Sequence, residues 1–211
     1  MNRSFSSAVV LALLVAGTSA ACGGAGRSTA DMYALAERNR RPHSPADARF
    51  MTSMIPHHAQ AVLFAGWSES HGAGRAVRVF SARMVVAQQD EIVTMRTWLA
   101  DHGEPVPPGG YMRMSDGGRD QAAVMPGMLT EEQLTALDEA SGVDFDRAFL
   151  TYMIPHHEGA LSMVDQLFDS YGGAQDDFVF KLASDIYADQ TTEIAHMREM
   201  LAAYPPARRR P

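Results

Sequence analysis

Hydrophobic side chains recur every three or four positions through four long segments, which is the period of an amphipathic helix. The predicted helices are residues 47–68, 74–101, 144–170 and 175–203. Glycine-containing turns at residues 71–74 and 171–173 join them into two hairpins. Alternating β-branched runs, the pattern of a strand, are scarce. The chain is therefore predicted to be all-α.

A connector, residues 104–143, separates the two hairpins and begins with a stretch rich in proline and glycine. Within it, Thr130 and Gln133 have the spacing of a capping box, which predicts one short helix. Two hairpins present four apolar stripes. An antiparallel four-helix bundle is the simplest arrangement that buries all of them.

The two hairpins are copies of one another. The run FMTSMIPHH at residues 50–58 returns as FLTYMIPHH at residues 149–157, and QQDEIVTMR at 88–96 returns as QTTEIAHMR at 190–198. Chance does not readily produce two ordered matches, so we infer an internal duplication. The predicted units are repeat 1 (residues 45–103), the connector and repeat 2 (residues 144–203), with the repeats forming one domain.

The repeated motif carries the chemistry. On a helical wheel, the two histidines of each motif flank a core-facing stripe that contains its methionine. On the second helix of each hairpin, a glutamate and a methionine share one face. A bundle interior is a usual place to build a metal site from such side chains. The candidate ligands are Met54, His57, His58, Glu91 and Met95 in repeat 1, and Met153, His156, His157, Glu193, His196 and Met197 in repeat 2.

The donor set predicts copper, as Cu(I) or Cu(II), ahead of zinc or iron, because thioethers are soft ligands and imidazole suits copper. Several alternatives stay open. The histidines either bind metal or serve packing and capping, and the two glutamates are ligands, hydrogen-bond partners of the histidines or surface charges. Met95 and Met197 are ligands or core fillers. His196, which replaces Thr94 of repeat 1, is a candidate ligand of repeat 2 alone.

Two further features disturb the regular pattern. Pro56 and Pro155 fall inside predicted helices, so each helix either begins near the proline or bends there and frees carbonyl groups beside the histidines. The connector is also rich in methionine, which forms either an auxiliary Cu(I) site or a hydrophobic plug over the bundle. These connector methionines are Met112, Met114, Met125 and Met128.

The N-terminus has the pattern of an export signal, residues 1–21, with Arg3, a short apolar run and small residues. Cys22 follows, and the sequence Ser-Ala-Ala-Cys resembles a bacterial lipobox, although Ser19 stands where an aliphatic residue is usual. Either Cys22 is lipidated and anchors the protein to a membrane, or the protein is secreted. Residues 22–44 are predicted to be a flexible tether.

Composition excludes other classes. The formal net charge is −7 and the body of the chain has no basic cluster, which argues against nucleic-acid binding. The three arginines in the tail, residues 204–211, are interpreted as a solvated end. A single cysteine excludes an internal disulfide. Nothing in the sequence identifies a protein partner or fixes an oligomeric state.

The Met-Ile-x-His-His motif followed by small residues, at residues 54–61 and 153–160, resembles a bacterial family named domain of unknown function 305. Residues 127–150 and the repeated Gln-x-x-Glu-Ile-x-x-Met pattern extend the resemblance over residues 45–203. It implies a ferritin-like helical fold, export and, from some members, copper binding tied to copper tolerance. Repeat 2, with His157-Glu158-Gly159, is closer to the family pattern than His58-Ala59-Gln60, which predicts that it is the better site.

The predicted function is an extracytoplasmic copper protein that buffers or transfers the metal. The chain shows no nucleophile motif or phosphate-binding loop, which favours a binding protein over an enzyme. A ferritin-like metal oxidase is one alternative, and a helical module without metal is another. A di-iron centre needs Glu-x-x-His on two helices, and only Glu193 and His196 supply it, because Thr94 interrupts the other copy.

Overall fold

The computed structural model describes residues 28, 43–111 and 125–204. The predicted signal, Cys22, most of the tether, Met112, Met114 and the tail beyond Tyr204 lie outside the described residues. Contacts divide the chain into residues 1–39 and 40–211, and the fold described below belongs entirely to the second part.

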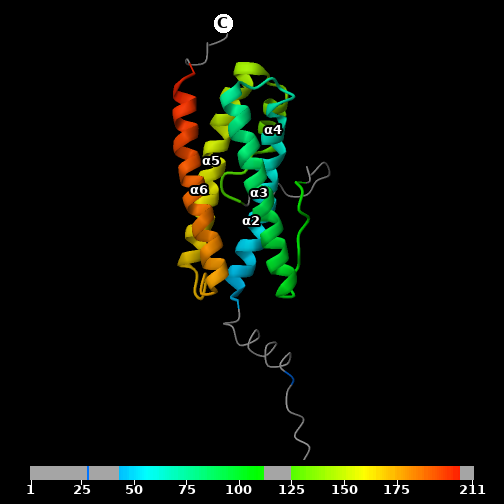
Figure 1. Ribbon diagram of the computed structural model, residues 1–211, viewed down its shortest axis with the longest axis vertical. Coiled ribbons are helices and arrows are strands. Elements are labelled where there is room, and N and C mark those ends of the chain that lie inside the picture. Colours follow the sequence, from blue (N-terminus) through cyan, green and yellow to red (C-terminus); the bar gives the residue numbers. More distant parts are fainter. Residues whose placement is uncertain (1–27, 29–42, 112–124, 205–211) are drawn as a thin grey trace, which may run out of the picture. The chain divides into compact units, whose positions relative to one another are not determined.

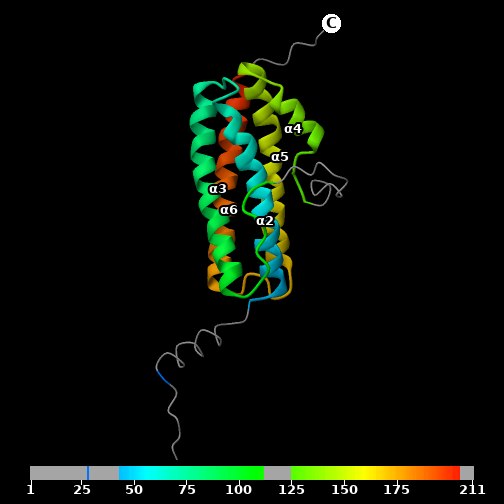
Figure 2. The ribbon, with the colours of Figure 1, turned by 90° about the vertical axis from the view of Figure 1, so that its right-hand side faces the viewer.

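The described residues form an all-α, four-helix bundle, as predicted, and contain no strand (Figure 1). Helix α2 packs against α3 in the first hairpin, α5 packs against α6 in the second, and α2 against α5 joins the two (Figure 2). None of the described helices is long and apolar enough to cross a membrane. The bundle helices are α2 (Pro45–Ala65), α3 (Arg75–Asp101), α5 (Gly142–Asp169) and α6 (Asp177–Ala202), with a short 3-10 turn η1 (Gly66–Ser68) after α2 and the connector helix α4 (Glu131–Asp138).

Local signals set the helix ends, which lie within three residues of the predicted bounds. Ser44 begins α2 with a capping box, and Thr130 begins α4 with the one that its spacing predicted. The hairpin turns use glycine where the backbone is left-handed, at Gly72 with φ 66° and Gly172 with φ 73°. Both internal prolines lie inside continuous helices, so the alternative that a helix begins at the proline is wrong.

The apolar core is divided into two clusters, each formed by side chains from all four bundle helices. The first cluster includes Met54, Trp98 and Met163, and the second includes Phe64, Phe149 and Met153. Along α2 and α5, the histidine pairs stand between residues of one cluster and residues of the other. The fold therefore places a polar layer in the middle of the bundle, between two apolar clusters.

Two buried aspartates link the hairpins reciprocally. A carboxylate oxygen of Asp47 on α2 accepts a hydrogen bond from the Ala174 amide in the turn before α6, at 2.7 Å. The carboxylate of Asp146 on α5 accepts one from the Gly74 amide just before α3, at 3.0 Å. Hydrogen bonds to charged groups each stabilise a fold by about 1.5–3 kcal/mol. Sequence analysis overlooked both residues, although Asp146 stands at the same offset from its motif as Asp47.

Candidate metal site

The four motif histidines meet in the polar layer. The ring centroids of His57 and His156 are 4.0 Å apart across the α2–α5 contact. Within each motif the geometry repeats, with centroids 6.4 Å apart for His57 and His58 and 6.3 Å for His156 and His157, and an interplanar angle of 55° in both. All four side chains are at most 1% exposed. The structure therefore brings the predicted histidines into one buried group.

Each outer histidine is oriented by a glutamate. His58 Nε2 donates to Glu91 Oε2 at 2.7 Å, and His157 Nε2 donates to Glu193 Oε2 at 2.9 Å. A carboxylate only accepts hydrogen bonds, so Nε2 of each ring carries the donated proton and Nδ1 faces away from the glutamate. Of the three alternatives for the glutamates, this arrangement matches hydrogen-bond partners of the histidines.

His57 has a different partner from its equivalent in repeat 2. Its Nε2 donates to the Pro126 carbonyl at 3.0 Å, which leaves Nδ1 without a proton. Buried ring nitrogens without a hydrogen-bond partner are unusual, and each invites an explanation such as a bound ion. Among the described residues the unpartnered nitrogens of this group are Nδ1 of His57, His58 and His157 and Nε2 of His156.

Burial keeps the inner histidines neutral. Desolvation, assisted by neighbouring His58, lowers the pKa of His57 from 6.5 to about 3, although its bond to Pro126 acts in the opposite direction. Desolvation and then the adjacent His57 ring lower the pKa of His156 well below its usual value. Since a metal binds only the unprotonated imidazole, neither ring needs to lose a proton at neutral pH before it can act as a ligand.

Sequence analysis did not propose the two glutamines of the repeated pattern as site residues. Gln88 and Gln190 lie one turn before Glu91 and Glu193, and both are 3% exposed. Their side-chain oxygens have no hydrogen-bond partner among the described residues. Their equivalent positions in α3 and α6 were the available signal. The two glutamine oxygens extend the set of unsatisfied polar atoms.

The predicted methionine ligands are fully buried, with Met54 and Met95 in the first apolar cluster and Met153 and Met197 in the second. His196, in contrast, is exposed, and its ring lies 5.8 Å from that of Phe80 on α3. The structure therefore does not bring His196 into the buried group. The inward-facing Glu-x-x-His pair that a di-iron centre requires is not assembled on α6.

No group of three or more His, Cys, Asp or Glu side chains within the described ranges is arranged to hold an ion. The imidazoles face one another, but they do not by themselves complete a coordination shell in this conformation. A metal site at this position therefore needs methionine sulfur or a ring rotation in addition to the histidines. The unpartnered nitrogens show that the donor atoms are present and uncommitted.

The model of one protein family, domain of unknown function 305 (DUF305), matches residues 47–201. This chain belongs to the DUF305 family. The match spans both histidine motifs and the segments that join them, and it covers all but the outermost residues of the bundle. A search of curated proteins found no match.

Solved structures of related proteins share the fold. A DUF305 fragment from Deinococcus radiodurans is 27% identical, with a TM-score of 0.65, over 77% of this chain and 99% of that one. CopM in its Cu(II)-bound form is 27% identical, with a TM-score of 0.59, over 74% and 95% of the two chains. CopM in its Cu(I)-bound form is also 27% identical, with a TM-score of 0.57 and the same coverage. Copper binding is thus a property of a related protein.

In this DUF305 chain, residues 125–129 of the connector cross the buried histidines, and we call this segment the strap. The Gln60 side chain forms two hydrogen bonds with the Leu129 backbone, donating at 3.0 Å and accepting at 2.8 Å. On the other side, a β-carbon at Gly159 would overlap the Pro126 carbonyl group. Met128 of the strap is buried, and both alternatives for it, a hydrophobic plug and a metal ligand, remain predictions.

Proposed function

We propose that this DUF305 protein binds copper outside the cytoplasm, with Cu(I) favoured, and holds it as a buffer or carrier. The observation that carries the proposal is the set of four buried imidazole nitrogens without hydrogen-bond partners, two from each repeat. Leaving such atoms unsatisfied costs about 1–3 kcal/mol for each group. A bound metal ion would recover that cost by accepting their lone pairs.

The donor chemistry supports a soft metal. Met54 and Met153 lie one helical turn before the first histidine of each motif, so thioether sulfur is available beside imidazole nitrogen. That combination suits Cu(I), whereas zinc and iron gain less from sulfur of this kind. Glu91 and Glu193 would fix the ring orientation and raise the basicity of their histidines. The Cu(I)-bound and Cu(II)-bound structures of CopM support the same choice of metal.

The setting suits storage or transfer better than catalysis. Apolar clusters lie on both sides of the polar layer, so a bound ion would be separated from solvent and from adventitious oxidants. The proposal includes export through the signal at residues 1–21. After export, either a lipid on Cys22 and the tether would hold the protein at a membrane, or the protein would be secreted. Copper tolerance would then follow from sequestration of the ion.

Titration of Cu(I) under anaerobic conditions against a competing chelator tests the proposal, with Cu(II), Zn(II) and Fe(II) measured in parallel. The variants are His57→Asn/His156→Asn and His58→Asn/His157→Asn, and circular dichroism checks that each is folded. His196→Asn is the matched control because that side chain is exposed. We expect tight Cu(I) binding that both double variants weaken and the control retains. Absence of tight binding, or binding indifferent to all four histidines, would leave a helical module without metal.

A further inference from the structure

The histidine group has no direct route to solvent. Its four side chains are at most 1% exposed, so an ion that reaches them must pass between protein groups. The strap covers one approach, because the Pro126 carbonyl accepts the hydrogen bond from His57. An ion arriving from this side would therefore meet the strap before it meets an imidazole.

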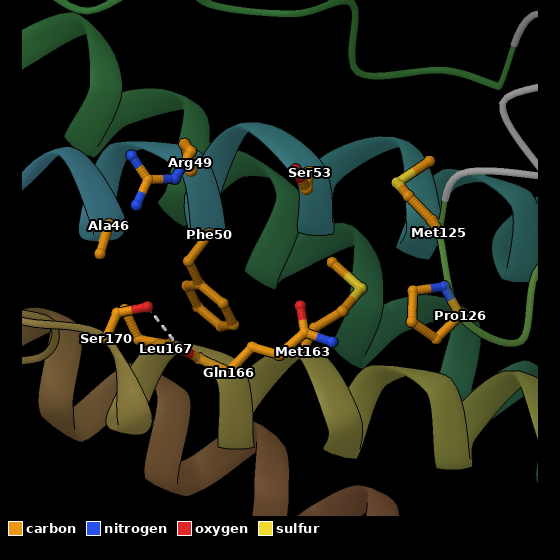
Figure 3. A pocket seen from close by; sticks show the side chains of 10 residues that line it. All are labelled: Ala46, Arg49, Phe50, Ser53, Met125, Pro126, Met163, Gln166, Leu167 and Ser170. Carbon is orange, nitrogen blue, oxygen red and sulfur yellow. Dashed lines mark hydrogen bonds between the residues drawn. The ribbon is translucent and has the colours of Figure 1, made fainter.

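A pocket of about 240 Å³ lies beside the strap, between α2 and α5 (Figure 3). Phe50 and Ser53 of α2 line one wall, and Met163 of α5 lines the other. Met125 and Pro126 of the strap close one end. Pro126 thus borders the pocket and also bonds to His57, which makes the pocket the space next to the buried group.

Two methionine side chains line this pocket, Met163 from α5 and Met125 from the strap (Figure 3). Met163 is 7% exposed and Met125 is partly buried, so both side chains are sheltered but border the pocket. Among the described residues that line the pocket there is no carboxylate and no imidazole. The cationic side chain there, Arg49, repels a divalent ion more strongly than a monovalent one.

We propose that Met125 and Met163 form an acquisition site for a soft monovalent cation, Cu(I) or Ag(I), which then passes beside the strap to His57. The inference deepens the proposed function and rests on it for the destination of the ion. Thioethers select soft ions and carry no charge. A site on a transfer route must bind strongly enough to capture the ion and weakly enough to release it, which two neutral sulfurs provide.

The test uses the full chain labelled with carbon-13 at the methionine methyl groups and Ag(I) as a redox-inert probe. We expect the Met125 and Met163 methyl signals to shift with the first additions of Ag(I). In stopped-flow loading with Cu(I), Met125→Leu/Met163→Leu should fill the histidines about tenfold more slowly, equivalent to about 1.4 kcal/mol in the barrier. Met200→Leu is the control, because Met200 lines a separate surface pocket between α3 and α6 and should load at the wild-type rate.

The outcomes separate this inference from the proposed function. If histidine signals respond to Ag(I) while both methyl groups stay fixed, and the double leucine variant loads at the wild-type rate, the acquisition site is overturned and the copper site stands. In His57→Asn/His156→Asn, methyl shifts that persist support the acquisition site independently of the histidines. If the methyl groups respond but wild-type histidines never do, the pocket binds the ion and the proposed destination fails.

Discussion

The two repeats are alike at the outer histidines and differ two residues later. The His58–Glu91 and His157–Glu193 bonds measure 2.7 and 2.9 Å, so the outer geometry is nearly the same in both copies. Two residues beyond each His pair, repeat 1 has Gln60 and repeat 2 has Gly159. Gln60 holds the strap by side-chain hydrogen bonds, and Gly159 makes room for it by having no side chain.

The two repeats differ where the strap crosses them. One strap must cross two equivalent helices, and a single segment cannot present the same face to both. The equivalent positions therefore hold an anchor, Gln60, and a gap, Gly159. The expectation that repeat 2 is the better metal site remains a prediction, because the departure that suggested it concerns the strap.

The largest expected effect is the pH dependence of stability that the two inner histidines cause. Both have a pKa lowered by burial, to about 3 for His57, so between that value and 6.5 the unfolded chain binds more protons than the folded one. Stability of the metal-free protein is therefore complete above about pH 6.5 and is lost as pH falls, by up to about 1.4 kcal/mol per pH unit for each histidine.

Denaturant unfolding across pH 4–8 (roughly the range over which histidine protonates) measures this slope. The single variants His57→Asn and His156→Asn should each remove about half of it if the layer is symmetric. A slope that only one of the two variants changes would show that the repeats bear unequal desolvation.

The next largest effect is the loss of stability expected when the space at Gly159 is filled. In Gly159→Ala the new β-carbon meets the backbone of Pro126, which cannot rotate aside. We expect the free energy of unfolding to fall by about 3 kcal/mol, the upper end for overpacking. Gly66→Ala is the matched control, because Gly66 has φ −61° and open space around its α-carbon. Equal stability of the two variants would contradict the close contact between α5 and the strap.

The anchor at Gln60 should contribute somewhat less. Gln60→Leu leaves the buried N–H and C=O of Leu129 without their partners, which should cost about 2 kcal/mol. Hydrogen exchange at the Leu129 amide should accelerate in the same variant. Gln89→Leu, at an exposed position of α3, is the comparison. Unchanged exchange at Leu129 would mean that the strap does not depend on this anchor.

The smallest expected effect is on Cu(I) affinity, when either of the two glutamates is replaced. Glu91→Gln and Glu193→Gln keep the side-chain shape but replace an anionic acceptor of the histidine proton, and each should weaken Cu(I) binding about tenfold. Competition titration measures the change, with exposed Glu158→Gln as the control. A larger loss in Glu193→Gln would establish repeat 2 as the better site, and equal losses would show that the repeats contribute alike.

Much of the bundle was predictable because its signals are local. Apolar periodicity and the capping residues fix the helices to within three residues, and duplication pairs the hairpins. The wheel placed His57 and His156 on the buried stripes correctly. It did not place His196, because a three-residue spacing from Glu193 is compatible with either flank of α6, and packing against Phe80 settles the outcome.

The strap could not be predicted for a physical reason. Its path is fixed by contacts between residues far apart in the chain, such as Gln60 with Leu129, 69 positions away. The strap has no helical periodicity in its sequence. Gln60 and Gly159 look like ordinary sequence variation between the repeats unless the position of the strap is known. The Asp47 and Asp146 contacts are hidden in the same way, since each carboxylate serves the turn of the opposite hairpin.

Those reciprocal aspartate contacts have a consequence for the symmetry of the bundle. Asp47 of the first hairpin binds the turn of the second, and the equivalent Asp146 of the second hairpin binds the turn of the first. Such a reciprocal contact has the form of an isologous two-fold interface. The two hairpins of this chain therefore meet as the two subunits of a symmetric homodimer do. A bundle with exact two-fold symmetry would offer two identical sides to any crossing segment. In this chain the two sides differ, because Gln60 forms hydrogen bonds with the strap and Gly159 leaves space for it.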